Sequence, residues 1–397
     1  MANRIHFVFL NIGHFFDHLF MLIFATVAAL ALAREWGMSY GGLIPYATPG
    51  FVAFGVCAVP AGWLADRWSR KGMMFVFYVG IGLSSILTAL AKSPLQIGIG
   101  LLAIGLFAAI YHPVGLALVV QGRRDTGVPL AVNGIFGNMG VASAALLTGF
   151  LIDHAGWRSA FLWPGVVSIA TGIAYAIFFY ATPGKAEKEN SFRAASEKVL
   201  QTQKMDRRLL TRVFAIIFFT TALGGLVFQS TTFALPKVFD ERLAELAVSA
   251  TLVGGYAFIV FAIAAFGQLV VGYLVDHYSI RSVFAMVAAL QAVLFMIMPG
   301  LMGWAALGIA IAFMFVVFGQ IPINDVLISR FTRTEWRSRI YGFRYIVTFS
   351  VMASSVPLIA WIHGHWGFDS LFAVLSAAAA CIFLSALLLP GVEHKQR

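Results

Sequence analysis

Long apolar runs follow one another from end to end of this 397-residue chain, each close to the 20 residues that an α-helix needs to cross a bilayer. The chain is 60% hydrophobic and 11% charged. A soluble domain averages about 25% charged residues, so this chain could not cover such a core against water. Helices satisfy their backbone hydrogen bonds internally, as a bilayer demands. We therefore predict an all-α, multi-pass membrane protein.

Twelve spans are expected. The first has no basic region or small-residue cleavage site of the kind that marks a signal peptide, so we expect a retained helix. The approximate limits of the spans are 6–33, 43–65, 72–92, 94–121, 128–153, 159–181, 210–238, 248–275, 281–300, 303–329, 339–363 and 367–390.

The basic residues predict the orientation. Most of the 27 Lys and Arg fall on one side of the predicted membrane, the side that also holds both termini, and basic loops face the cytoplasm. We expect a bacterial inner-membrane protein with both termini cytoplasmic. The formal charge of +10 is spread over many short loops, so it indicates topology and argues against a nucleic-acid partner.

The sequence gives no sign of an enzyme. It contains no phosphate-binding loop, no nucleophile elbow and no clustered metal-ligand motif. Cys57 and Cys381 both fall inside apolar segments and predict neither a disulfide nor a metal site. We expect no cofactor and no bound metal, and a monomer among membrane lipids.

A polar linker divides the chain. Residues 183–209 are rich in Lys, Glu, Arg, Ser and Gln and follow the sixth span, which predicts a solvated cytoplasmic tether. The predicted units are a six-helix bundle at 1–182, the linker at 183–209 and a second six-helix bundle at 210–397.

One short pattern occurs three times, always where an apolar run ends: Gly, three residues, Asp, then Arg or His. Its first and third copies, at Asp66 and Asp276, lie about half the chain apart, as duplication of one bundle would leave them. The second copy, at Asp153, falls on the other side of the membrane. It suggests an older duplication of inverted three-helix repeats.

Twelve spans in a 6+6 arrangement with Gly62-x-x-x-Asp66-Arg67-x-x-Arg70-Lys71 after span two resemble the major facilitator superfamily. The resemblance implies a secondary transporter whose two bundles rock around a central site. It also implies that Asp66 faces the start of span eleven, where a helix N-terminus attracts negative charge. Arg70 and Lys71 would meet acidic partners or lipid phosphates. The third copy has Ile280 in place of the middle base, so we expect a weaker clamp there. The implied gating residues are Gly62, Asp66, Arg67, Arg70, Lys71, Gly272, Asp276 and Arg281.

A narrower resemblance lies in spans one, four and five. His14-Phe-Phe-Asp17-His18, Tyr111-His112-Pro113 and Gly134-Ile-Phe-Gly137-Asn138 are similar to the fosmidomycin-resistance branch of exporters. That branch tends to have Asn-Asp where this chain has Asp17-His18, and Glu where it has Val114. The carboxylate that the branch carries in span four is therefore absent.

Three ionisable residues share one face of the first span. His14, Asp17 and His18 stand at i, i+3 and i+4, near the middle of the bilayer. Charged groups there are costly and normally face a bundle interior or a water-filled cavity. A carboxylate beside a histidine can exchange a proton near neutral pH. We predict a proton or substrate site; a neutral cluster that locks helix packing is the alternative.

Pro113 frees a backbone carbonyl and bends span four beside His112. Bent helices often build transporter sites, yet a histidine at such a bend can equally cap the freed carbonyl. Both interpretations of His112 stay open. Tyr111 would form an aromatic wall or donate a hydrogen bond.

Asp325 and Arg344 lie near the cytoplasmic ends of spans ten and eleven. A mutual ion pair, or a cytoplasmic gate, is the simpler interpretation. Alternatively, Arg344 attracts an anionic substrate. Internal symmetry places Asn133 opposite Arg344, so both are predicted to line the central cavity.

The leading functional hypothesis is proton-coupled efflux of a small anionic or amphipathic solute by alternating access. Its coupling or binding residues would be His14, Asp17, His18 and His112, with Arg344 as the anion contact. One alternative is a proton-coupled importer of an organic acid or metal chelate. Another is a transporter of free metal ion with His14, Asp17 and His18 as ligands, which make a poor cage unless His112 joins them. A transport-inactive sensor is the last, and the Asp17–His18 cluster argues against it.

Overall fold

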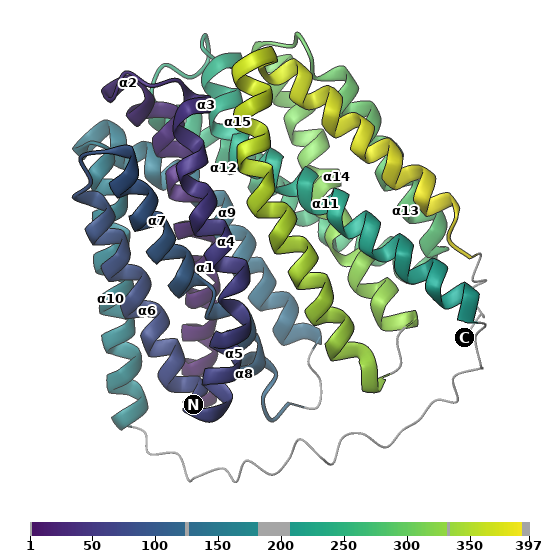
Figure 1. Cartoon of the computed structure of the whole chain (residues 1–397), viewed down its shortest axis with the longest axis horizontal. Coiled ribbons are helices and arrows are strands. Elements are labelled where there is room, and N and C mark those ends of the chain that lie inside the picture. Colours follow the sequence, from purple (N-terminus) through teal and green to yellow (C-terminus); the bar gives the residue numbers. More distant parts are fainter. Residues whose placement is uncertain (1, 124–126, 182–206, 332–333, 391–397) are drawn as a thin grey trace.

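The computed structural model describes residues 2–123, 127–181, 207–331 and 334–390, and its regular elements are all helical. In Figure 1 they form two bundles of long helices side by side. The first comprises α1 (Ala2–Val27), η1 (Ala28–Leu32), α2 (Ala33–Glu35), α3 (Tyr40–Leu43), η2 (Ile44–Ala47), α4 (Thr48–Val56), α5 (Ala58–Arg67), α6 (Arg70–Ala89), α7 (Pro94–Ala108), η3 (Tyr111–Gly115), α8 (Leu116–Val120), α9 (Gly127–Ala155) and α10 (Trp157–Ala181). The second comprises α11 (Arg207–Arg242), α12 (Ala250–His277), α13 (Ile280–Ile297), α14 (Gly303–Phe331) and α15 (Thr334–Leu387).

Among the described residues, eleven helical segments are long and apolar enough to cross a membrane. The last of them, at 346–387, has 42 residues, about twice the length of one crossing. It turns at Gly367, where φ is 74° and ψ is −176°, a backbone conformation that favours glycine. The described residues thus form two helices there and twelve membrane-crossing helices in all, which confirms the predicted fold class.

Serine caps fix where several spans begin. Ser69 Oγ accepts a hydrogen bond from Gly72 N at 3.0 Å, and Ser249 Oγ accepts one from Leu252 N at 3.2 Å. These bonds satisfy backbone donors that have no partner inside the helix. Glycines with positive φ, at Gly156 and Gly300, mark two of the turns that return the chain into the membrane.

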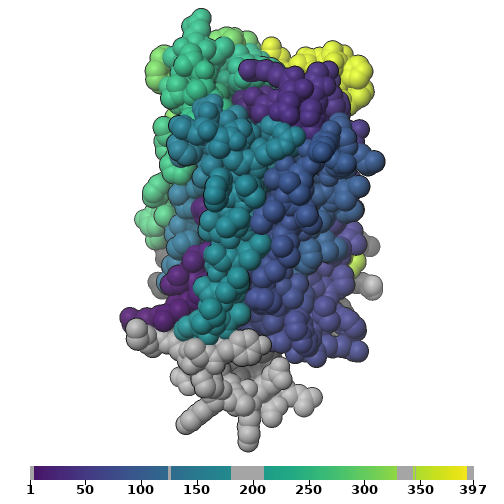
Figure 2. Space-filling view, turned by 90° about the vertical axis from the view of Figure 1, so that its left-hand side faces the viewer, coloured from purple at the N-terminus to yellow at the C-terminus, as the bar shows by residue number. Residues whose placement is uncertain are grey.

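The outer surface of the first bundle is apolar. Figure 2 views this face, where α6 and α10 pack along each other. Leu83 and Leu87 on α6, and Trp163 and Ile177 on α10, are each at least half exposed. Such side chains suit a lipid environment and would be costly in water.

The two bundles meet chiefly at one end. In Figure 1 they lie together at the end that carries α2 and α3, and they diverge toward the end that carries the N-terminus. The segment that joins them, predicted as a linker at 183–209, falls mostly outside the described residues. α11 begins at Arg207, three residues before the predicted start of the second bundle at 210. The domain limits stay predictions.

Candidate functional site

A cavity of about 310 Å³ lies between the two bundles, and both contribute to its walls. The wall formed by the first bundle carries three histidines among apolar side chains. The wall formed by the second carries amides and one arginine. The polar lining residues are His14, His18, His112 and Asn138 on one side, and Thr221, Gln229, Thr232, Gln268, Gln291, Gln320, Asn324, Arg344 and Thr348 on the other.

The three histidines form a compact triangle. The ring centroids of His14 and His18 lie 5.0 Å apart, those of His14 and His112 5.4 Å, and those of His18 and His112 5.6 Å. One candidate ligand nitrogen from each residue lies within 4.8 Å of the other two. His112, expected either at the site or as a carbonyl cap, is thus brought to the cluster on α1.

Asp17 lies behind this triangle. Its side chain is fully buried, and its Oδ2 atom lies 3.3 Å from His112 Nε2. Neither carboxylate oxygen of Asp17 meets hydrogen-bond geometry with a described residue. Among these residues, His112 is the charged or polar group that its carboxylate faces. An isolated buried carboxylate would be very unfavourable in an apolar medium, which makes this partner essential. Asp17 therefore acts on the cavity through His112 and does not line it.

Tyr111 and Asn133 do not line the cavity, which corrects the placement expected for Asn133. The Asn133 side-chain amide donates to Tyr111 Oη at 2.9 Å and to Asn11 Oδ1 at 3.0 Å. Tyr111 Oη donates to the carbonyl oxygen of Leu10 at 2.7 Å. These hydrogen bonds satisfy the polar groups of both side chains and join α9 and η3 to α1. Buried polar groups need such partners. Arg344, the partner of Asn133 by internal symmetry, instead lines the cavity and contacts Asp325.

Asn133 still affects the site, through its backbone. His14 Nδ1 lies 2.8 Å from the carbonyl oxygen of Asn133. A carbonyl oxygen can only accept, so Nδ1 carries the proton and Nε2 keeps its lone pair. The contact fixes both the tautomer and the orientation of the His14 ring.

Arg344 on α15 forms an ion pair with Asp325 on α14, as the simpler interpretation expected. The arginine side chain is 14% exposed, and that of Asp325 is 47% exposed. Arg344 Nε is buried and has no hydrogen-bond partner among the described residues. Arg344 also lines the cavity, so it can donate to an anionic group there without leaving its helix position.

The amide groups of the second wall were not anticipated from the sequence. Gln291 Nε2 on α13 donates to Gln320 Oε1 on α14 at 2.7 Å, and both side chains are almost fully buried. Asn324 and Gln268 complete this polar strip. The signal was present as amides inside apolar spans, but each one alone is more typical of a helix–helix hydrogen bond.

The first copy of the repeated motif lies at the end of α5. Asp66 Oδ1 accepts from Arg70 Nη2 at 2.8 Å within the same loop. Arg67 lies over the ring of Trp63, and Lys71 over that of Phe179. A Cβ on Gly62 would approach Pro113 Cβ at 3.2 Å, so this glycine allows close packing against η3.

The role implied for Asp66 against the start of span eleven stays a prediction. The side chains at the start of α15 lie outside those that the structure describes. In the third copy, a Cβ on Gly272 would meet nothing within 4 Å, so no neighbouring helix among the described residues packs closely against this glycine. Asp276 is exposed, and Arg281 is partly buried at the start of α13.

The second copy does in this structure what the resemblance implies for the first. Asp153, at the end of α9, accepts from the backbone N–H groups of Ala250 and Thr251 at 3.2 and 2.7 Å, and from the Thr251 hydroxyl at 2.5 Å. These N–H groups open α12, where a negative charge is favourable. The helices touch here, because a Cβ on Gly149 would lie only 2.2 Å from the carbonyl oxygen of Ala250.

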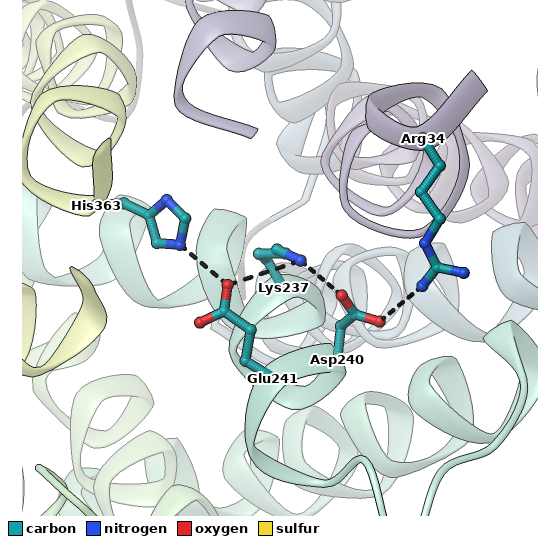
Figure 3. A network of polar contacts seen from close by, with 5 residues as sticks. All are labelled: Arg34, Lys237, Asp240, Glu241 and His363. Carbon is teal, nitrogen blue, oxygen red and sulfur yellow. Dashed lines mark hydrogen bonds and ion pairs between the residues drawn. The ribbon is translucent and has the colours of Figure 1, made fainter. Parts of the chain in front are cut away.

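Five further residues connect the bundles at the same end, and we call them the polar latch (Figure 3). Arg34 of the first bundle lies 3.5 Å from Asp240 on α11. Lys237 bridges Asp240 at 2.6 Å and Glu241 at 3.6 Å, and His363 Nε2 on α15 lies 3.0 Å from Glu241. Of these contacts, Arg34–Asp240 joins the two bundles, as Asp153 does with the start of α12.

Known proteins share both the sequence pattern and the fold. The chain is 25% identical to a gallate transporter of Pseudomonas putida over 66% of its length and 63% of that protein. It is 23% identical to a probable sulfoacetate transporter of Cupriavidus necator over 54% of its length and 52% of that protein. It is 27% identical to a multidrug resistance protein B homologue of Mycobacterium tuberculosis over 39% of its length and 29% of that protein. The matches thus cover less than two thirds of each relative.

Over the whole chain, the structure is similar to the crystal structure of a D-xylose–proton symporter, with a TM-score of 0.76, 13% identity and coverage of 97% of each chain. A likeness at that identity establishes the fold. The sequence profile described as Major Facilitator Superfamily matches residues 10–356. The chain therefore belongs to the major facilitator superfamily.

Proposed function

We propose that this protein is a proton-coupled transporter of a small organic anion, with its proton site in the first bundle and its anion site in the second. The observation that carries the proposal is the division of the cavity lining. The Asp17–His112 pair stands on one side, and Arg344 with the amide strip stands on the other. Rocking of the bundles would expose both sites to one side of the membrane and then to the other.

The Asp17–His112 pair suits the proton role because it joins a buried carboxylate to a histidine that lines the cavity. In a low-dielectric site such a pair is most stable without net charge, which a proton shared between carboxylate and imidazole would provide. Exchange requires that proton and anion occupy the cavity in turn. The bundles rock in one direction with an added proton on the pair and no anion at Arg344, and in the other direction with the anion bound and that proton released.

Arg344 suits the anion role. Its guanidinium offers planar donors that match a carboxylate or sulfonate. The gallate and sulfoacetate transporters among the relatives are named for anions of this kind. An arriving anion would compete with Asp325 for Arg344, so binding at the cavity would loosen the contact between α14 and α15.

We propose export as the direction, on the resemblance of spans one, four and five to fosmidomycin-resistance exporters. We also propose that both termini face the cytoplasm of a bacterial inner membrane, on the distribution of basic loops. The polar latch then closes the periplasmic end, and the cavity belongs to an inward-facing state. Import remains the rival, because one transport cycle runs either way with the gradients.

The test uses proteoliposomes with an imposed pH gradient and labelled gallate, followed by other aromatic carboxylates and small sulfonates. We expect accumulation that depends on the gradient, and loss of uphill accumulation in Asp17→Asn while substrate exchange continues. Accumulation against a gradient in Asp17→Asn would refute the coupling role. Glu245→Gln, which changes an exposed carboxylate in the loop after α11, is the matched control.

The same vesicles distinguish the rivals by the sign of the gradient. An antiporter accumulates substrate when the lumen is acidic, because protons leave as the anion enters. A symporter accumulates it when the lumen is alkaline. Accumulation only with an alkaline lumen would contradict the antiport required for proton-driven export.

A further inference from the structure

The three cavity histidines have a geometry that proton transfer alone does not require. His14 and His18 stand one turn apart on α1, and His112 reaches them from the π-helical turn η3. One ring nitrogen from each lies within 4.8 Å of the others. An ion bound tetrahedrally at about 2.0–2.1 Å places its ligand nitrogens about 3.3 Å apart. Binding would therefore draw the nitrogens together by at most about 1.5 Å, with the rings of His18 and His112 moving toward the fixed ring of His14.

The environment of His14 prepares it to act as a ligand. Its Nδ1–H donates to the Asn133 carbonyl oxygen at 2.8 Å, so Nε2 is the unprotonated nitrogen. A Cβ built on Gly137 would lie 2.7, 2.8 and 2.9 Å from Nε2, Cε1 and Cδ2 of this ring. Nearly equal distances to these three atoms place Gly137 over the face of the ring, which leaves the in-plane lone pair of Nε2 clear.

Asp17 completes the arrangement from behind. Its carboxylate approaches His112 Nε2 at 3.3 Å and is fully buried. Histidines that bind metals commonly contact a carboxylate through their other ring nitrogen, which fixes the tautomer and strengthens the ligand. The sequence suggested Asp17 as a third ligand on α1; the structure instead places His112 in that position and Asp17 behind it.

We propose that His14, His18 and His112 form a binding site for one divalent transition-metal ion in the wall of the central cavity, with Asp17 as the residue that positions His112. Three imidazoles suit zinc, nickel, copper or cobalt and disfavour magnesium or calcium. The fourth coordination position faces the cavity and takes water or a donor atom of an anionic chelator.

The charge of the site favours an accompanying anion. Three neutral imidazoles leave the two positive charges of the ion uncompensated, and the Asp17 carboxylate offsets only one of them. Arg344 across the cavity adds another positive charge. Both a free ion and its complex with a carboxylate chelator present the same metal chemistry to the three histidines.

The test is a metal titration of the purified full-length transporter, with any affinity tag removed. CoCl2 is the probe, because its visible absorption reports the ligand set, and ZnCl2 is the competitor. We expect one Co²⁺ per chain, displaced by zinc, and affinity at least about 10-fold lower in His14→Ala, His18→Ala and His112→Ala. Asp17→Asn should lower it by about 10- to 100-fold, as loss of an outer carboxylate does.

Matched controls come from two exposed histidines outside the cavity. His154 and His277 each contact a carbonyl oxygen of their own helix at 2.8 Å, and their alanine variants should bind Co²⁺ as the parent protein does. His18→Cys keeps a ligand, so it should retain Co²⁺ and add a thiolate charge-transfer band. That band would not arise if His18 served packing alone, and it keeps the test valid where an alanine variant fails to fold.

The titration measures metal binding and no flux, so its result does not depend on whether the transport assay supports the proposed function. Absence of stoichiometric Co²⁺ binding in the parent protein, or binding unchanged in the triple alanine variant, would overturn the proposal. A second titration with zinc citrate identifies the source of the ion. If the complex is the ligand, Arg344→Gln should weaken binding of zinc citrate about 10-fold or more and leave zinc alone unaffected; if the free ion is the ligand, citrate should compete.

Discussion

At the scale of single residues, the site depends on which buried groups have spare hydrogen-bonding capacity. Asn133 and Tyr111 satisfy one another and the backbone of α1, so they position other residues. Arg344 shares its guanidinium with Asp325 and has an unpartnered Nε among the described contacts. Satisfied polar groups hold helices together, whereas unsatisfied ones can still bind a ligand.

The Arg344–Asp325 pair yields two opposite predictions. Arg344→Gln should weaken anion binding by roughly 10- to 100-fold, because it removes a charged hydrogen bond worth about 1.5–3 kcal/mol. Asp325→Asn should tighten binding, because the anion no longer competes with a carboxylate for the arginine. Thermal stabilisation of the purified protein over a series of gallate concentrations measures both. If both variants shift affinity in the same direction, Arg344 is not the anion contact.

The His14 ring yields a prediction about packing. Gly137→Ala places a methyl group under 3 Å from three ring atoms, so it should displace His14 and destabilise the protein by roughly 1–3 kcal/mol. Gly134→Ala, one turn away on α9, meets nothing within 4 Å. It should be neutral or stabilising by up to about 1 kcal/mol, since alanine favours helix. Thermal unfolding compares the pair, and equal shifts in midpoint would contradict the packing of His14 against Gly137.

At the scale of helices, the span pattern could be predicted from the sequence because the length of an apolar run is a local signal. The spacing of His14, Asp17 and His18 also predicted which face of α1 points into the bundle. The approach of His112 could not be predicted in this way, since it depends on how η3 bends toward α1. The roles of Asp153 and of the polar latch were missed for the same reason, because their partners lie on helices of the other bundle.

The contact between α9 and the start of α12 gives a prediction about the conformational equilibrium. Asp153→Asn should weaken the closed end by about 0.5–2 kcal/mol, the usual value of a helix N-terminal cap. The population closed at the polar latch should therefore fall by roughly 2- to 30-fold relative to the open one. Distances between spin labels placed across that end report the shift. Asp66→Asn should shift the equilibrium the opposite way, and an unchanged distribution in Asp153→Asn would exclude a gating role for this cap.

At the scale of the whole molecule, the two bundles are related in fold and different in chemistry. The first presents ionisable imidazoles to the cavity and keeps a carboxylate behind them, while the second presents amides and an arginine. The repeated motif places an aspartate at the ends of both bundles, and in this structure the copy at Asp153 meets the other half. Duplication of one bundle, which the repeated motif predicts, would account for the related folds of the halves, and later divergence of the two walls would account for their different chemistry.

The central claim is that proton movement and anion movement are one process, joined across the cavity. It is tested most directly by a pH indicator trapped in proteoliposomes while a gradient of gallate, or of the anion that the screen identifies, is imposed without a pH gradient. The account predicts that anion flux alone moves protons in the parent protein. It also predicts that Asp17→Asn still exchanges anion with no change of lumenal pH. Anion flux in the parent protein at constant lumenal pH would contradict it.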